Sequence, residues 1–141
     1  LVRHASHDRV PLTLPENFDE LNILISNPKK IQTFLNDLHK YDEVVTSALH
    51  VFIVCQSYGI PCSLVTFEGV ENSISGTGLK YADYSLGVGL RELTPLVVAR
   101  DLRKANLEKT RQLEAIPESK KDEIEEKILE SIAYFNNGRA Q

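Results

Sequence analysis

The chain contains no methionine and no tryptophan, and it has only two cysteines. It begins at Leu1 with no methionine anywhere, so we expect it to be either a processed chain or, as we favour, a piece cut from a longer protein. Cys55 and Cys62 form a CX6C spacing, which matches neither a zinc motif nor a redox motif. Both lie in apolar stretches, so we expect buried, reduced thiols and a cytoplasmic protein.

Long apolar runs and an excess of positive charge are also missing. The longest candidate, 49–55, is interrupted by His50 and falls far short of the roughly 18 residues of a membrane span. Lys and Arg total 16 against 20 Asp and Glu, a net charge of −4. Nucleic-acid binding needs a dense basic surface, so no nucleic-acid partner is expected. No secretory signal is visible at the N-terminus.

What the chain does contain is enough apolar residue for one folded domain. Its 141 residues are 42% hydrophobic and 26% charged. Between residues 21 and 67, strand and helix patterns alternate. We expect a strand at 21–25, a helix at 28–40 capped by Asn27, a strand at 43–46, a helix at 49–58 closed by Gly59, and a strand at 63–67. Such alternation predicts an α/β fold, a Rossmann-like three-layer domain with a mostly parallel sheet, over residues 1–141.

The segments before residue 21 and after residue 67 have weaker secondary-structure patterns. The apolar residues between 2 and 14 fit either a further strand or a loop. Residues 68–89 hold five of the seven glycines and predict a long loop. Thr94 and Pro95 predict a helix through Arg103, and Asn106 would cap a shorter one. The last helix is expected from 118 to 135, closed by Gly138, with its charge run as the solvated face.

The junction after the strand at 43–46 is the best candidate for chemistry. Ligands of open α/β sheets bind where a parallel strand passes its carboxyl end into a helix. Ser47 would cap the following helix, whose free amides would point at a bound anion. His50 would lie in the first turn of that helix, either as a ligand contact or as a structural residue.

Two blocks of sequence carry a resemblance to a known family. The first is VVTSALHVFI at 44–53, followed by SYGIP at 57–61; the second is GTGLKYADY at 76–84, followed by GVG at 87–89. Together they resemble the polysaccharide pyruvyl transferase family. In that family a strand ends in Ser-Arg-Leu-His-Gly, a helix leads to Gly-Ile-Pro, and a glycine-rich segment ends in Lys-aromatic-x-Asp-Tyr. The resemblance spans residues 21–89, about half of the chain.

The resemblance implies the C-terminal Rossmann-like half of a two-domain GT-B-like protein. Such an enzyme transfers a pyruvyl group from phosphoenolpyruvate, its donor substrate, to a sugar of a cell-surface polysaccharide or exopolysaccharide, without a cofactor. It would act in the cytoplasm or at the inner membrane face, with an N-terminal domain of the same protein and a glycan acceptor as partners. Carried over by position, His50 is the catalytic candidate. The implied substrate-binding residues are Ser47, Leu49, His50, Gly76, Gly78, Lys80, Asp83 and Tyr84.

Two departures from the family pattern stand in the same motif. Ala48 replaces the Arg, whose guanidinium would hold a phosphate through paired hydrogen bonds, and Val51 replaces the Gly, where it would crowd a ligand. Lys80 is the candidate substitute cation. The isolated domain is expected to be inactive. A nucleotide-sugar-binding glycosyltransferase half and an inactive binding module are the alternatives.

Other sequence features carry less weight. His4, His7 and Asp8 form an HX2HD pattern, but without a third converging ligand we expect no metal site. Tyr84 fits a core position as well as a cleft. No Ser-His-Asp arrangement and no paired carboxylates are recognisable from the spacing.

Overall fold

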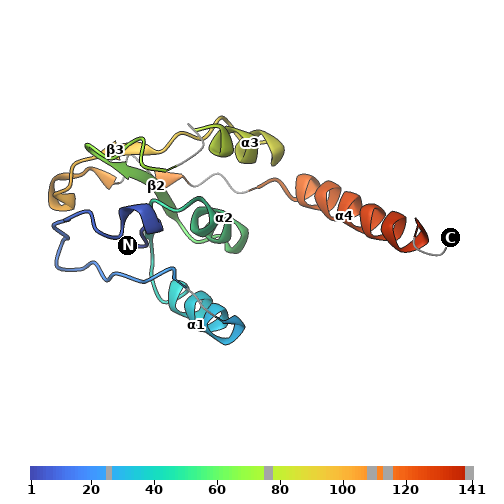
Figure 1. The fold of residues 1–141 in the computed structure, drawn as a ribbon, viewed down its shortest axis with the longest axis horizontal. Coiled ribbons are helices and arrows are strands. Elements are labelled where there is room, and N and C mark those ends of the chain that lie inside the picture. Colours follow the sequence, from blue (N-terminus) through green and yellow to red (C-terminus); the bar gives the residue numbers. More distant parts are fainter. Residues whose placement is uncertain (25–26, 75–77, 108–110, 113–115, 139–141) are drawn as a thin grey trace.

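A small parallel sheet forms the centre of the computed structural model, which describes residues 1–24, 27–74, 78–107, 111–112 and 116–138 (Figure 1). Its strands are β1 (Val44–Thr46), β2 (Cys62–Phe67) and β3 (Leu96–Val98), in the order β1-β2-β3. Both pairings are parallel. The two-residue strand β4 (Arg111–Gln112) joins the first residues of β2 in the antiparallel sense. The molecule is thus a mixed α/β fold with a mostly parallel sheet, as expected.

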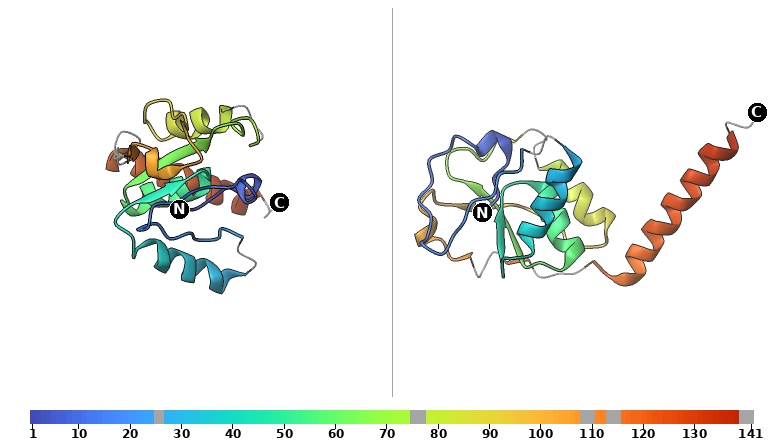
Figure 2. Two further views of the ribbon diagram at one scale, coloured as in Figure 1. Left: turned by 90° about the vertical axis from the view of Figure 1, so that its left-hand side faces the viewer. Right: turned by 90° about the horizontal axis from the view of Figure 1, so that it is seen from below.

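Three helices cover one face of this sheet, and a fourth extends away from it. They are α1 (Pro28–Leu38), α2 (Leu49–Tyr58), α3 (Leu79–Gly87) and α4 (Glu118–Gly138) (Figures 1 and 2). The opposite face is covered by the N-terminal segment up to Phe18 and by the short 3-10 helix η2 (Leu102–Lys104). In the part of the chain that is described, this second face carries loop and 3-10 structure and not the α-helices expected of a Rossmann-like three-layer domain.

The predicted helices at 28–40 and 49–58 are confirmed as α1 and α2, although α1 ends two residues earlier, at Leu38, with His39 as its C-cap. The Asn27 side chain accepts a hydrogen bond from the Lys30 amide at 3.0 Å, and Pro28 takes the first helical position. At the end of α2, Gly59 adopts φ 70°, and its amide donates to the carbonyls of Cys55 and Gln56. The strands expected at 43–46 and 63–67 correspond to β1 and β2.

The strand predicted at 21–25 is wrong for its described part, residues 21–24; residues 25–26 lie outside the described structure. Leu21 forms a single parallel bridge to Val2. Val2 already occupies the edge of β1: its amide donates to the Val45 carbonyl at 2.9 Å, and its carbonyl accepts from the Ser47 amide at 3.2 Å. Leu21 is therefore held outside Val2, and the N-terminal segment is a loop held by isolated bridges.

Two predictions after Phe67 are also wrong. The expected loop at 68–89 contains α3 in its second half, because Tyr81 and Ser85 are buried and Tyr84 packs against the core. The expected helix from Thr94 to Arg103 is instead β3 followed by η2. The shorter helix predicted after Asn106 falls on residues 107–110, of which 108–110 lie outside the described residues. The last helix is confirmed as α4, which ends at Gly138.

The core has two parts, one on each face of the sheet. On the helical face, Phe52 and Cys55 of α2 pack with Leu64 of β2 and Leu38 of α1. On the other face, Phe67 and Val65 of β2 pack with Leu102 and the N-terminal segment. Cys55 and Cys62 are buried and unlinked, as expected. Within the described residues, no helix has the length and apolar composition to cross a membrane.

Candidate functional site

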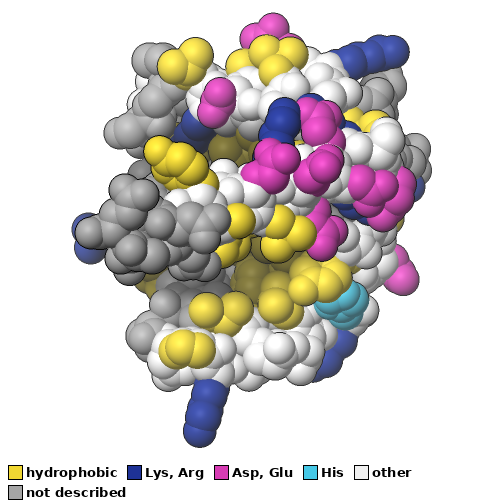
Figure 3. Space-filling view, turned by 90° about the vertical axis from the view of Figure 1, so that its right-hand side faces the viewer, with side chains coloured by type: hydrophobic (Ala, Val, Ile, Leu, Met, Phe, Trp, Pro, Cys, Tyr) yellow, Lys and Arg dark blue, Asp and Glu magenta, His cyan; other side chains and the backbone are white. Residues whose placement is uncertain are grey.

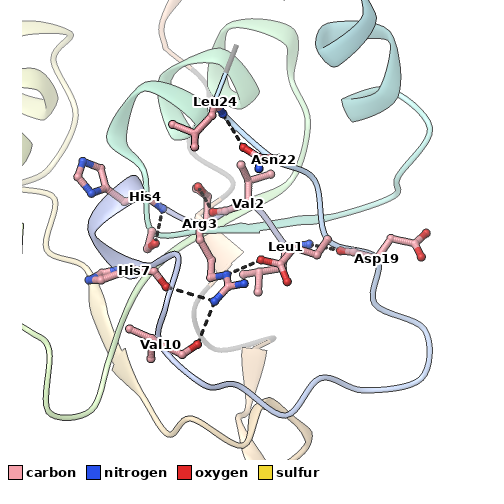
Figure 4. A network of polar contacts seen from close by, with 12 residues as sticks. Leu1, Val2, Arg3, His4, His7, Val10, Asp19, Asn22 and Leu24 are labelled. Carbon is pink, nitrogen blue, oxygen red and sulfur yellow. Dashed lines mark hydrogen bonds and ion pairs between the residues drawn. The ribbon is translucent and has the colours of Figure 1, made fainter. Parts of the chain in front are cut away.

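The carboxyl end of β1 is tied to the N-terminal segment by side-chain hydrogen bonds (Figure 4). The His4 amide donates to the Ser47 hydroxyl at 2.9 Å, and Ser47 is fully buried. Thr46 Oγ1 donates to the Val2 carbonyl at 2.8 Å and accepts from the Ala48 amide at 3.0 Å. Ser47 therefore holds the N-terminal segment in place.

The predicted capping role of Ser47 is wrong. The N-cap of α2 is Ala48, which has an extended backbone (φ −108°) and no side chain that could accept a hydrogen bond. Only the Ala48 carbonyl takes part in the helix, accepting from the amides of Val51 and Phe52. The amides of Leu49 and His50, in the first turn, have no helical acceptor. The site therefore offers an uncapped helix start to an anion.

His50 and Lys80 both lie close enough to His4 for their charges to act on its ring. His50 is exposed in the first turn of α2, and Lys80 lies in the first turn of α3. The pKa of His4 is lowered, first by burial and then by the positive charges of Lys80 and His50, which places both near its ring. His4 Nδ1 accepts from the Ser6 amide at 3.1 Å, so the neutral ring keeps its proton on Nε2. The structure thus brings two predicted residues together and adds His4.

The start of α3 also lacks a side-chain cap. Its N-cap is Gly78, with φ 80°, a conformation that favours glycine, and a Cβ added there would meet no atom within 4 Å. The Lys80 ammonium group lies 5.3 Å from the ring of Tyr81, which is buried. Two uncapped helix starts and two exposed or half-exposed basic side chains therefore flank the same edge of the sheet.

The other predicted site residues have different positions. The Leu49 side chain is buried in the core, so only its backbone faces the helix start. Tyr84 packs against the same core, and its hydroxyl donates to Gln56 Oε1 at 2.8 Å, joining α3 to α2. Asp83 is exposed on α3. Gly76 lies outside the described residues.

The side chains at the two positions that depart from the family motif, Ala48 and Val51, point into the protein. Ala48 is 1% exposed and Val51 is 2% exposed, and both belong to the core of the helical face. Val51 therefore does not crowd a ligand, which corrects the expectation from sequence. An arginine at position 48 would force its stem into a packed core, where added volume costs about 1–3 kcal/mol.

His7 connects this edge to the loop after β2. It is fully buried, its ring packs edge-on against Phe67, and Nε2 lies 2.8 Å from the Ser73 hydroxyl. That hydroxyl donates to the Val70 carbonyl at 2.7 Å, so His7 Nε2–H is the donor. The ring centroids of His4 and His7 are 6.2 Å apart. The HX2HD spacing drew attention to both histidines as metal candidates, but it did not predict these hydrogen-bonding roles.

The described side chains include no cluster of three or more His, Cys, Asp or Glu residues that could hold a metal ion. What converges at the edge is instead a set of hydrogen-bond donors: helix amides, an imidazole and an ammonium group. Such a set binds phosphate or carboxylate oxygens. Comparison with known proteins finds no matching family model, no matching curated protein and no matching solved structure.

Proposed function

We propose that the chain is the C-terminal, Rossmann-like half of a polysaccharide pyruvyl transferase-like protein with GT-B architecture. In this proposal the carboxyl edge of β1 binds the phosphate and carboxylate of phosphoenolpyruvate, and the pyruvyl group passes to a sugar of a cell-surface polysaccharide or exopolysaccharide. An N-terminal domain would hold most of the acceptor, on the cytoplasmic side of the membrane. The observation that carries the proposal is the uncapped start of α2, with His50 in its first turn and with His50 and Lys80 both near His4.

Each group at this edge has a part in the proposed reaction. The backbone amides at the start of α2 donate hydrogen bonds to the phosphoenolpyruvate anion. Lys80 supplies the permanent positive charge that an arginine supplies in the family. Two sugar hydroxyls add to C2 of phosphoenolpyruvate, one of their protons goes to C3, and the C2–O bond to phosphate breaks. His50 contacts the phosphate and donates a proton to it as it leaves, and the second hydroxyl proton restores His50. His4 stays neutral because its Nδ1 is engaged, so it offers one further N–H.

A thermal-shift titration tests the proposal with three ligands: phosphoenolpyruvate, inorganic phosphate and a nucleotide sugar. A ligand at about 100 times its Kd adds about 2.7 kcal/mol of stability. We expect phosphoenolpyruvate to raise the melting temperature by several degrees and inorganic phosphate to do so less, because it lacks the carboxylate. A larger shift with the nucleotide sugar would favour the glycosyltransferase alternative and would contradict the proposal.

Two variants assign the binding to this edge. His50→Gln and Lys80→Gln each remove one charged hydrogen bond, worth about 1.5–3 kcal/mol, so each should weaken phosphoenolpyruvate binding about tenfold or more. His39→Gln and Lys40→Gln are matched controls, because both residues are exposed at the far end of α1. If all four variants bound phosphoenolpyruvate like the original chain, the site would be elsewhere.

A further inference from the structure

α4 leaves the body of the molecule as an extended arm (Figures 1 and 2). Its root lies at the end of the α3 region, since a Cβ on Gly89 would come within 3.9 Å of the Lys120 side chain. Of its described side chains, none belongs to either part of the core. Ile128, Leu129 and Ile132 are each about half exposed or more. An isolated helix of this kind is marginal in water, so its apolar face needs a cover.

The apolar residues of α4 form one stripe with an acidic border. Ile124, Ile128 and Ile132 recur at intervals of four and Leu129 widens the stripe, so they share one side of the helix. Ile124, Ile128 and Leu129 line a groove of about 310 Å³ at the start of the arm, together with Ile116, Lys121 and Glu125. Asp122 and Glu125 lie along the Leu129 edge of this stripe, by helical periodicity.

The arm also carries uncompensated negative charge. Its lysines, at 120, 121 and 127, all pair within the helix, with Glu118 and Glu123. The remaining acidic residues make no ion pair within the described structure: Asp122, Glu125, Glu126 and Glu130. A partner surface that fits the arm should therefore be apolar with a basic border.

The start of α1 has this complementary character. Lys29 and Lys30 lie in its first turn, which contains no acidic residue, and both are exposed. Positive charge at a helix N-terminus is unfavourable, because it adds to the positive end of the helix dipole. Ile31, next to them, is 48% exposed, and Leu24 is 64% exposed. An acidic, apolar helix placed there would relieve the repulsion and cover both apolar residues.

Figure 3 shows the end of the molecule from which the arm projects. Acidic side chains gather on its upper part, hydrophobic side chains surround a hollow below them, and basic side chains lie along the lower edge. Because the arm points away from the body, it cannot reach α1 of its own chain. A second copy can supply it.

We propose that α4 is an exchanged arm: in a two-fold dimer, the α4 of each copy docks on the start of α1 of the other. The stripe from Ile124 to Ile132 covers Ile31, and Asp122 and Glu125 face Lys29 and Lys30. A 21-residue helix is about 30 Å long, so two reciprocal contacts would bury on the order of 1,200 Å², near the lower end of stable interfaces. This dimer is independent of the proposed function.

Sedimentation of the 141-residue chain tests the dimer directly. We expect a concentration-dependent dimer that is well populated at about 100 µM, consistent with a small interface. Ile128→Asp combined with Ile132→Asp should give a monomer with unchanged thermal unfolding, since neither residue belongs to the core. A chain that stays monomeric at about 100 µM would overturn the proposal and leave the arm to a different partner.

A charge exchange tests the pairing of α4 with α1. The variant K29E/K30E and the variant D122K/E125K should each raise the dimer dissociation constant about tenfold, because each places like charges in contact. In an equimolar mixture both contacts of the mixed dimer are complementary again, so dimerisation should return. Glu16→Lys, at an exposed position of the N-terminal segment, is the charge control. Failure of the mixture to recover would rule out this pairing, and undiminished dimerisation of K29E/K30E alone would instead indicate direct contact between two α4 helices.

Discussion

At the residue scale, the two histidines of the N-terminal segment connect it to the rest of the fold through hydrogen bonds that their sequence positions do not predict. His4 joins the segment to Ser47 through its amide and starts the 3-10 helix Ala5–His7 through its ring. His7 joins the segment to the loop after β2 through Ser73. Both imidazoles are engaged in their neutral forms, so protonation of either one should loosen the edge of the sheet.

Acid should therefore destabilise the fold between about pH 7 and pH 5. The pKa of His4 and the pKa of His7 are both lowered, chiefly by burial, so the unfolded chain binds more protons than the folded chain as the pH falls below the usual histidine value of about 6.5. Stability from these groups is thus present above that value and lost below it. Urea unfolding at pH 7.5, 6 and 5 measures the slope.

The variants His4→Asn and His7→Gln should flatten this dependence. Asn keeps an acceptor for the Ser6 amide, and Gln keeps a donor for Ser73, so the contacts survive while the titrating group is removed. Each variant should lose less stability between pH 7.5 and pH 5 than the original chain. An undiminished slope in both variants would show that other groups control the acid response.

At the element scale, single residues decide where several helices begin and end. α1 starts where Asn27 and Pro28 stand, and α2 ends at the left-handed Gly59. α2 and α3 begin without side-chain caps, at Ala48 and Gly78. The uncapped starts lie at the candidate site, where they leave amides available to an anion, whereas the capped start of α1 does not.

Gly59→Ala should destabilise the fold by about 1–2 kcal/mol, because the left-handed conformation strains any residue with a Cβ. No atom lies within 4 Å of the added Cβ, so the loss would report backbone strain alone. Gly87→Ala is the matched control: it lies in α3, also in open space, and should be neutral or stabilising by up to about 1 kcal/mol. Equal effects in the two variants, measured by urea unfolding, would contradict this role of Gly59.

Local signals explain which elements could be predicted from sequence. α1 and α2 have a cap and a glycine stop within their own residues, and β1 and β2 are short apolar runs between them. β3 could not be predicted, because Leu96–Val98 become a strand through a distant parallel pairing with Val65–Phe67. Thr94 and Pro95 carry a helix-start signal that this pairing overrides. The strand at 21–25 failed for the same reason, since Val2 takes the place beside β1.

The candidate site was predictable in part. The strand-to-helix junction and the family motif pointed to His50 and Lys80, and the structure places both near His4. The capping role of Ser47 failed, because its hydroxyl is taken by the His4 amide from 43 positions away in the chain. Val51 could not be assigned to the core from sequence, because α2 is apolar around most of its circumference and periodicity does not mark its buried side.

At the scale of the whole molecule, two surfaces are left without a partner in the described structure. One is the carboxyl edge of β1, where amides, His50 and Lys80 gather. The other is the arm α4, whose acidic, apolar stripe matches the basic start of α1. The first surface suits a small anion and the second suits a second copy of the chain, so a domain of this size can hold a donor and dimerise independently.

The central claim is that phosphoenolpyruvate binds at the start of α2. The most direct measurement is a titration of the ¹⁵N-labelled chain followed by NMR, with the backbone amides assigned. We predict the largest shifts at Leu49 and His50, with smaller ones at Leu79 and Lys80, and loss of these shifts in His50→Gln. Shifts confined to another part of the chain, or none at all at saturating phosphoenolpyruvate, would contradict it.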